Sequence, residues 1–308
     1  MILGIFLVWY SVDSLDTQAR QEIKTAFKEA NYFWIALSVI LGVISHISRA
    51  VRWKIAIKPL GYKIKTINAV AAVYIGYFTN LIFPRAGEFS RAAAIQQTET
   101  IPFDQAFGTI ITERAIDLIM LFLVALLALG LQTDYILDLL KERIPNDPYQ
   151  ILLLLGLFTV ILSTIIWLVY KSNNSLSQRL KKAIKGLLKG LSSIARMQQK
   201  WLYIFHSFFI WFLYLAMFYV ATLSIEATSS LPLSAITTGF IVGSLSIAAT
   251  NGGIGSYPLG IQQAMKLYGV PAIAGLSFGW IMWSTQTLMM ILLGGLSFLF
   301  LKRKPKTN

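Results

Sequence analysis

The sequence predicts an all-α polytopic membrane protein with about six full spans and two opposed re-entrant helical hairpins, arranged like an inverted repeat. The chain of 308 residues is 56% hydrophobic and only 13% charged, whereas about a quarter of a soluble domain is charged. Several runs of 17 or more residues are almost wholly apolar, which is enough to cross about 30 Å of hydrocarbon. Two further apolar stretches are interrupted by glycine and proline. We therefore treat residues 1–308 as a single integral membrane domain.

Apolar runs define the predicted full spans. The clearest cover residues 33–50, 151–170, 201–225 and 272–301, and another covers 106–131. Residues 1–10 are apolar but short for a span, and they lack the basic start and cleavage site of a signal peptide. We expect a short or incomplete first membrane helix there, followed by a mixed-charge amphipathic segment at 14–30 on the outer face.

Basic residues are concentrated in three segments, which orients the chain. Residues 171–200 hold eight Lys or Arg and no acid, residues 52–65 hold five, and 302–306 hold four, whereas 132–149 holds two basic and four acidic residues. The positive-inside rule places the three basic segments, including the C-terminus, in the cytoplasm. The net charge of +13 then reflects loops that face anionic lipid, and no nucleic-acid partner is expected.

The first predicted hairpin covers about residues 66–98. Residues 52–65 are cytoplasmic, and span 106–131 must start in the cytoplasm so that the acidic loop after it lies outside. The intervening chain must therefore return to the side from which it started. Pro84 ends a helix and Gly87 permits a tight reversal, so residues 66–83 enter, "PRAGE" turns, and 89–98 return. The alternative is that 66–98 contains two true spans.

The second predicted hairpin covers about residues 233–270, and the same counting makes it begin and end outside. Its centre is "TNGGIGSYP", a break between two short apolar arms. Asn80 and Asn251 each precede a break. Paired broken segments in corresponding halves of a chain are a sequence indicator of a transport site.

Charged residues lie inside or beside these apolar segments. Glu113 and Asp117 are four residues apart and share a helix face, with Arg114 turned away from Glu113. Charges in a membrane cost a few kcal/mol unless they are paired or hydrated, so they mark candidate functional sites. Their expected partners are Arg85 and Arg91, which could hold a lipid phosphate in their planar forks, with Glu88 as a further acid. The alternatives are structural ion pairs alone, Glu113–Arg91 or Asp117–Arg85, or a solvated Glu113 at the interface.

Other polar positions receive structural interpretations first. Gly252, Gly253 and Gly255 could expose backbone N–H groups to an anion, or they could simply allow close packing. Arg49 and Arg52 are expected to extend to the cytoplasmic headgroups, with Trp53 in the interfacial belt. His46 fits a helix–helix hydrogen bond or a titrating group. About residues 175–197, lysines and arginines oppose a regular apolar face, which predicts a basic amphipathic helix on the cytoplasmic leaflet.

With these motifs in view, the chain resembles the lysylphosphatidylglycerol synthase transmembrane (flippase-like) family. The resemblance rests on "SRAVRWK", "LIFPRAGEFSRAAAI", "TERAIDLIMLF" and "NGGIGSYPLGIQQAM", in chain order. It implies a domain that moves an aminoacylated or related lipid between leaflets. It also implies functional roles for a set of charged residues and for the three glycines: Arg85, Glu88, Arg91, Glu113, Arg114, Asp117, Gly252, Gly253 and Gly255. The sequence stops directly after its last predicted span, so we expect a stand-alone member without the aminoacyl-transferase domain.

The predicted function is therefore lipid translocation in a bacterial-type inner (plasma) membrane, without catalysis, cofactor or metal. The substrate would be an anionic or aminoacylated phospholipid or a carrier lipid, bound by Arg85 and Arg91, while Glu88, Glu113 and Asp117 exchange protons. Two other classes stay open. One is an integral-membrane lipid-modifying enzyme, although the chain has no cysteine and only two histidines. The other is a non-catalytic partner of such an enzyme.

Overall fold

The computed structural model describes residues 2–13, 15–132 and 194–301, together with positions 171, 178, 181 and 192. These described residues form helices and connections and contain no strand, which confirms the all-α prediction. The predicted span at 151–170, nearly all of the acidic loop 132–149 and most of the basic segment 175–197 lie outside the described residues.

Three described helices are long and apolar enough to cross a membrane: α3 (Tyr32–Ile57) with the short η1 (Lys58–Leu60), α10 (Lys200–Thr222), and α14 (Ala272–Phe300). A fourth long helix, α6 (Phe103–Gly130), has 28 residues and carries Glu113, Arg114 and Asp117 near its middle. At about 1.5 Å per residue α6 is about 42 Å long, so these charges lie about 15–26 Å from its ends.

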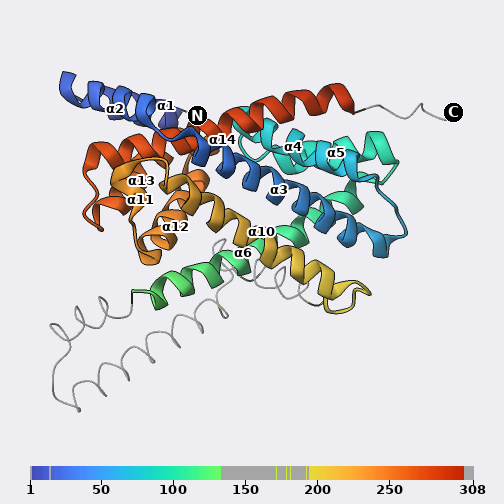
Figure 1. Cartoon of the computed structure of the whole chain (residues 1–308). Coiled ribbons are helices and arrows are strands. Elements are labelled where there is room, and N and C mark those ends of the chain that lie inside the picture. Colours follow the sequence, from blue (N-terminus) through green and yellow to red (C-terminus); the bar gives the residue numbers. More distant parts are fainter. Residues whose placement is uncertain are drawn as a thin grey trace, which may run out of the picture.

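Helices α3 and α10 pack antiparallel along their length (Figure 1). At one end the Asn31 amide donates to the Ser224 carbonyl at 2.8 Å. Towards the other end, Ser48 Oγ lies 2.8 Å from His206 Nδ1. The N-terminal pieces α1 (Ile2–Asp13) and α2 (Thr17–Glu29) lie at the end where α3 begins (Figure 1), and α2 packs on α14.

The predicted first hairpin is a helical pair, α4 (Thr66–Ile82) and α5 (Gly87–Glu99). Asn80 Oδ1 accepts a hydrogen bond from the Gly87 amide at 2.7 Å and fastens the turn. At the open end, Glu99 Oε1 accepts from the Lys65 amide at 2.9 Å and from Asn68 Nδ2 at 2.8 Å. The pair therefore starts and finishes at the same end of the bundle. Its helices are about 26 and 20 Å long, at about 1.5 Å per residue.

The second hairpin pairs α12 (Leu233–Ala249) with α13 (Ser256–Lys266), joined through η2 (Asn251–Gly253). Tyr268 closes its open end, because its hydroxyl lies 2.8 Å from Thr238 Oγ1 and donates to the Ser234 carbonyl at 3.2 Å. The short α11 (Glu226–Ser229) connects α10 to this pair.

The tips of the two hairpins contact one another. Asn251 Nδ2 donates to the Ile82 carbonyl at 3.4 Å, and Trp283 Nε1 of α14 donates to the Gly252 carbonyl at 2.8 Å. α14 runs beside α13 and then beside α4 (Figure 1). The two hairpins thus approach one another from opposite ends of the bundle, with α14 linking them.

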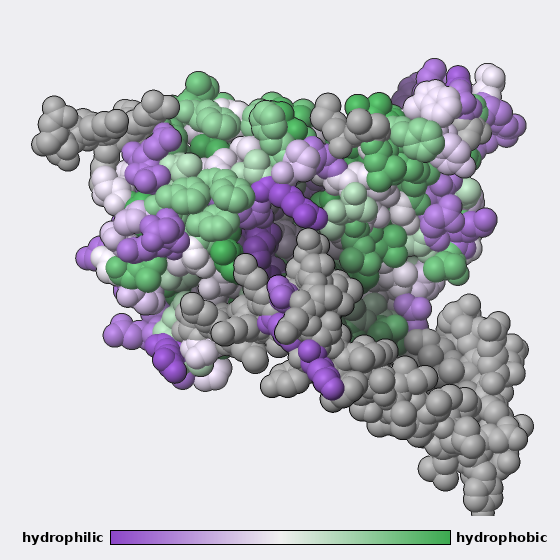
Figure 2. All heavy atoms as spheres, turned by 180° about the vertical axis from the view of Figure 1, so that it is seen from behind, coloured by the Kyte–Doolittle hydropathy of each residue, from purple (hydrophilic) through white to green (hydrophobic). Residues whose placement is uncertain are grey.

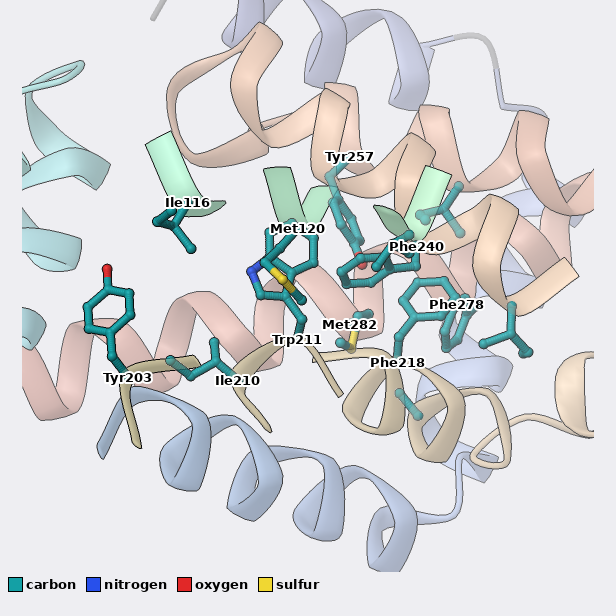
Figure 3. Close-up of a cluster of buried hydrophobic side chains, with 14 of the residues drawn as sticks. Ile116, Met120, Tyr203, Ile210, Trp211, Phe218, Phe240, Tyr257, Phe278 and Met282 are labelled. Atoms are coloured by element: carbon teal, nitrogen blue, oxygen red, sulfur yellow. The ribbon is translucent and has the colours of Figure 1, made fainter. Parts of the chain in front are cut away.

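Two apolar cores hold these pieces together. The first joins α6, α10, α12, α13 and α14 through large side chains, among them Trp211, Phe218, Phe240 and Phe278 (Figure 3). The second lies between α3, α4, α5 and α6 and is built largely from alanine and isoleucine. Small residues allow backbones to approach closely, which is how helices associate in lipid. This close approach brings the polar faces of α3, α5 and α6 into contact.

Candidate functional site

Arginines of α3 form the inner part of the candidate site, and the sequence-based placement of these residues was wrong. Arg49 is only 4% exposed, and Arg52 and Trp53 are 0% exposed, so they do not extend to the headgroups or the interface. They point into the bundle because α6 and α10 offer carboxylates and hydroxyls on the facing side. Burying an arginine that is paired with a carboxylate therefore costs less free energy than separating α3 from the helices against which it packs.

Two carboxylates of α6 bind these arginines. Arg49 Nη1 lies 2.8 Å from Glu113 Oε1 and 2.7 Å from Asp117 Oδ2. Arg52 Nη2 lies 2.7 Å from Asp117 Oδ1 and 3.2 Å from Glu113 Oε1. The spacing of four residues puts both acids on one face, as predicted. Asp117 therefore pairs with arginines of α3 and not with Arg85.

Helix α10 contributes hydroxyl groups to the same arginines. Arg49 Nη2 donates to Tyr214 Oη at 3.2 Å, and Arg52 Nη1 donates to Ser207 Oγ at 3.2 Å. Charge-assisted bonds of this kind fix the guanidinium planes. The arginines are held in place before any ligand arrives.

Arg91 of α5 completes the buried cluster. It binds Glu113 through both nitrogens of its fork, at 3.2 Å to Oε1 and 3.0 Å to Oε2. Its guanidinium carbon lies 3.9 Å from the centre of the Trp53 ring, a cation–π contact. The Trp53 indole in turn donates to Thr109 Oγ1 at 2.9 Å. The Glu113–Arg91 pair anticipated from the sequence is present.

An outer ion pair borders the cluster. Arg114 Nε lies 3.4 Å from Glu88 Oε1 and Arg114 Nη1 lies 3.8 Å from Asp117 Oδ2, with side chains that are 44% exposed for Arg114 and 26% for Glu88. A small open pocket of about 10 Å³, about the space of one water molecule, lies here and is lined among others by Tyr77, Asn80 and Arg91. The pocket therefore connects the buried cluster to the surface.

The cluster carries an excess of positive charge. Arg49, Arg52, Arg91 and Arg114 give four positive charges against three negative charges from Glu88, Glu113 and Asp117, a difference of one. The Nε atoms of the three buried arginines also have no hydrogen-bond partner among the described residues. Buried donors without partners are costly, and a net cation at this depth favours a bound anion.

The remaining predicted site residues lie elsewhere. Arg85 is exposed at the turn of the first hairpin, with a φ of 61°, and no ion pair joins it to the described residues. Asn251 and the glycines at 252, 253 and 255 form the turn of the second hairpin. There a Cβ on Gly255 would approach the Gly4 carbonyl of α1 at 2.8 Å. This geometry matches the close-packing alternative for the glycines, and none of these residues lines the pocket.

A pattern in α3 could have identified its two buried arginines. Small and polar residues repeat at intervals of four and three along one face of this otherwise apolar helix, and the structure buries that face: Ser38, Gly42, Ser45, Arg49 and Arg52. Such a stripe points toward other helices and not toward lipid.

No group of three or more His, Asp or Glu side chains suited to a metal ion occurs among the described residues.

Comparison with known proteins places the chain among membrane proteins. It is 33% identical over 100 residues to the UPF0104 membrane protein MJ1595 of Methanocaldococcus jannaschii, covering 32% of this chain and 30% of the relative. It is 29% identical over 99 residues to Glycosyltransferase AglD of Haloferax volcanii, covering 32% of this chain and 16% of the relative. The chain thus matches less than a third of the length of either relative. No solved structure matches it.

A family model covers almost all of the chain. The model of the lysylphosphatidylglycerol synthase TM region matches residues 1–295, which include both hairpins and every arginine and acid of the cluster. Together with the membrane-length apolar helices, this match shows an integral membrane protein that belongs to the lysylphosphatidylglycerol synthase TM region family.

Proposed function

We propose that the protein is a lipid translocase, which moves an anionic or aminoacylated phospholipid or a carrier lipid between leaflets. The observation that carries the proposal is the arginine-rich cluster near the middle of α6. It has an excess of one positive charge and connects to an open pocket. Ionised groups at membrane depth usually line the path of a polar substrate or ion.

The surface around the pocket suits a lipid whose headgroup leaves water while its tails stay in the bilayer. Exposed apolar side chains cover the long helices, including Leu118, Phe122 and Leu126 on α6. Viewed from behind, hydrophilic atoms lie in a recess between apolar areas (Figure 2). A phosphate that enters the pocket would meet the half-exposed Arg114 first and the buried Arg91 behind it.

The opposed hairpins supply the transport geometry. In the proposed arrangement both are re-entrant, because α5 and α13, with 13 and 11 residues, are shorter than a bilayer core of about 30 Å. Non-helical backbone at membrane depth is tolerated where protein buries it, and here the turn of the second hairpin, Asn251–Gly253, is largely buried and contacts Ile82 of the first. We further propose a plasma membrane of bacterial type, with the basic C-terminal segment in the cytoplasm.

Glu88 is the acid best placed to exchange protons with water, because it is partly exposed at the pocket mouth while Glu113 and Asp117 are enclosed by arginines. Uphill transport would then draw on an ion gradient. Arg85, exposed at the hairpin tip, would attract the phosphate from outside the pocket, before it meets Arg114.

Reconstitution in liposomes tests the proposal. Lipids that carry a fluorophore on an acyl chain keep their native headgroup, and dithionite added outside bleaches only those in the outer leaflet. The wild type is expected to remove the protected inner fraction, and Arg114→Gln to slow this at least tenfold. Lys28→Gln, at an exposed position of α2, is the matched control and should behave as the wild type. Equal rates with and without protein would refute translocation.

A relative named a glycosyltransferase makes a lipid-modifying enzyme the second candidate, and a partner of such an enzyme is the third. Product formed by the purified protein in detergent, where no second leaflet exists, would favour the enzyme. Activity that appears only with an added enzyme would favour the partner.

A further inference from the structure

A second group of buried polar atoms without partners includes two beside Tyr77, a residue that lines the pocket. His46 of α3 is 5% exposed and Tyr74 of α4 is 3% exposed. His46 Nδ1, Tyr74 Oη and Gln286 Nε2 of α14 are all buried, with no hydrogen-bond partner among the described residues. We define these three residues as the neutral subsite. Three separate helices present it, so it does not arise from a single local irregularity.

Aromatic rings connect the neutral subsite to the arginine cluster. The centre of the His46 ring lies 4.6 Å from that of Tyr77, 5.5 Å from that of Tyr74 and 6.2 Å from that of Tyr214. Tyr77 also lines the pocket, and Tyr214 accepts a hydrogen bond from Arg49. None of the three residues of the neutral subsite lines the pocket itself, so a headgroup bound at the arginines would reach these uncharged donors and acceptors by moving past Tyr77.

The chemistry of the two sides specifies a composite headgroup. Guanidinium groups in excess bind a phosphate. An imidazole, a phenol and an amide among aromatic faces bind hydroxyl groups, because they both donate and accept hydrogen bonds. Neither side offers a free carboxylate to an ammonium group, because Glu88, Glu113 and Asp117 each pair with an arginine.

We infer that the headgroup taken by this site is a phosphodiester of a neutral polyhydroxyl alcohol, such as glycerol or a sugar, and that headgroups bearing added ammonium groups are rejected. The inference rests on the proposed translocase function and narrows its substrate class. A lysylated glycerol headgroup adds two positive charges to a site that already has an excess of one, and like charges at short range disfavour binding.

The first experiment compares three acyl-labelled lipids in the liposome assay: phosphatidylglycerol, phosphatidic acid and lysyl-phosphatidylglycerol. The expected order of rates has phosphatidylglycerol fastest and lysyl-phosphatidylglycerol at least tenfold slower. Equal rates for the three lipids would overturn the inference and leave the translocase proposal standing. No protein-dependent movement of any lipid would overturn both.

The second experiment removes one hydroxyl group. Tyr74→Phe deletes an oxygen that no described residue binds, so a purely structural role predicts unchanged folding and unchanged selectivity. A role in headgroup binding predicts that the rate ratio of phosphatidylglycerol to phosphatidic acid falls about three- to tenfold, the effect of one hydrogen bond. Tyr257→Phe is the matched control, because Tyr257 is 7% exposed in the first core (Figure 3) and does not line the pocket. Its ratio should not change, and an unchanged ratio in Tyr74→Phe would refute the neutral subsite.

The third experiment reverses the charge of the pocket. Arg114→Glu changes the sum of the cluster from +1 to −1 without disturbing a fully buried side chain, since Arg114 is half-exposed. The preference should shift toward lysyl-phosphatidylglycerol by at least tenfold relative to the wild type, with Arg114→Gln intermediate. Lys28→Glu makes the same change of charge on the surface of α2 and should leave the preference unaltered. A preference that stays constant across the Arg114 series would contradict the electrostatic basis of the inference.

Discussion

The buried pair Arg91–Glu113 and the outer pair Arg114–Glu88 both connect α5 to α6, and they allow a sharp test of what burial does to an ion pair. The inner pair has side chains that are 4% and 1% exposed and contacts at 3.0 and 3.2 Å. The outer pair is 44% and 26% exposed, with a contact at 3.4 Å. A double-mutant cycle with Gln at each position removes the charges, and Gln matches Glu in shape but is shorter than Arg.

Glu113→Gln alone should lower the free energy of unfolding by about 3–5 kcal/mol, because it leaves three buried arginines facing one acid. Adding Arg91→Gln restores the original excess of one positive charge among the buried groups. The double variant should therefore lose about 2–3 kcal/mol less than the sum of the single losses. In the outer pair the coupling should stay below about 1 kcal/mol, because water screens exposed charges.

Unfolding in mixed micelles, driven by increasing dodecyl sulfate and followed by the fluorescence of the eight tryptophans, measures these energies. The outer-pair cycle, run in the same micelles, is the internal control for changes in detergent binding. An inner coupling no larger than the outer one would refute the view that the cluster is a water-excluded unit, and with it the electrostatic reasoning for anion binding.

Three further outcomes follow from the packing. Gly87→Ala should destabilise the protein by about 1–3 kcal/mol or more in the same micelle assay, because a Cβ would overlap the carbonyl of the facing α4. Gly108→Ala, which meets open space, should be neutral or mildly stabilising. In a variant with Trp53 as its sole tryptophan, the fluorescence should resist quenchers dissolved in water or in lipid, since Trp53 is fully buried. Strong quenching would instead support a position of Trp53 at the membrane interface. Single cysteines at Lys63 and Thr100, introduced into a chain that has none of its own, should react with an impermeant thiol reagent from the same side of the membrane, and labelling from opposite sides would exclude re-entry of the first hairpin.

The sequence by itself determined the class of the protein and most helix positions. Apolar runs, proline and glycine breaks and charge asymmetry are local properties, so they located α10, α14 and both helical pairs to within a few residues, whereas the predicted span 33–50 ended seven residues before α3 does, at Ile57. The spacing of Glu113 and Asp117 also fixed their common face, because helical periodicity alone sets it. How these pieces cross the membrane stays a prediction.

Only the tertiary structure decided which charges meet. Arg49 and Arg52 lie near the end of a predicted span, and the stripe of small and polar residues along α3 indicates only that they face other helices, without saying which side chains they bind. The choice depends on carboxylates more than 60 residues away on α6 and hydroxyls on α10, and on the close approach that small residues allow. The first hairpin illustrates the same limit. Arg85 and Arg91 belong to one sequence motif, yet Arg85 lies at an exposed turn and Arg91 is buried. Which buried charges pair depends on how the helices assemble, because a charge removed from water is stable only next to an opposite charge.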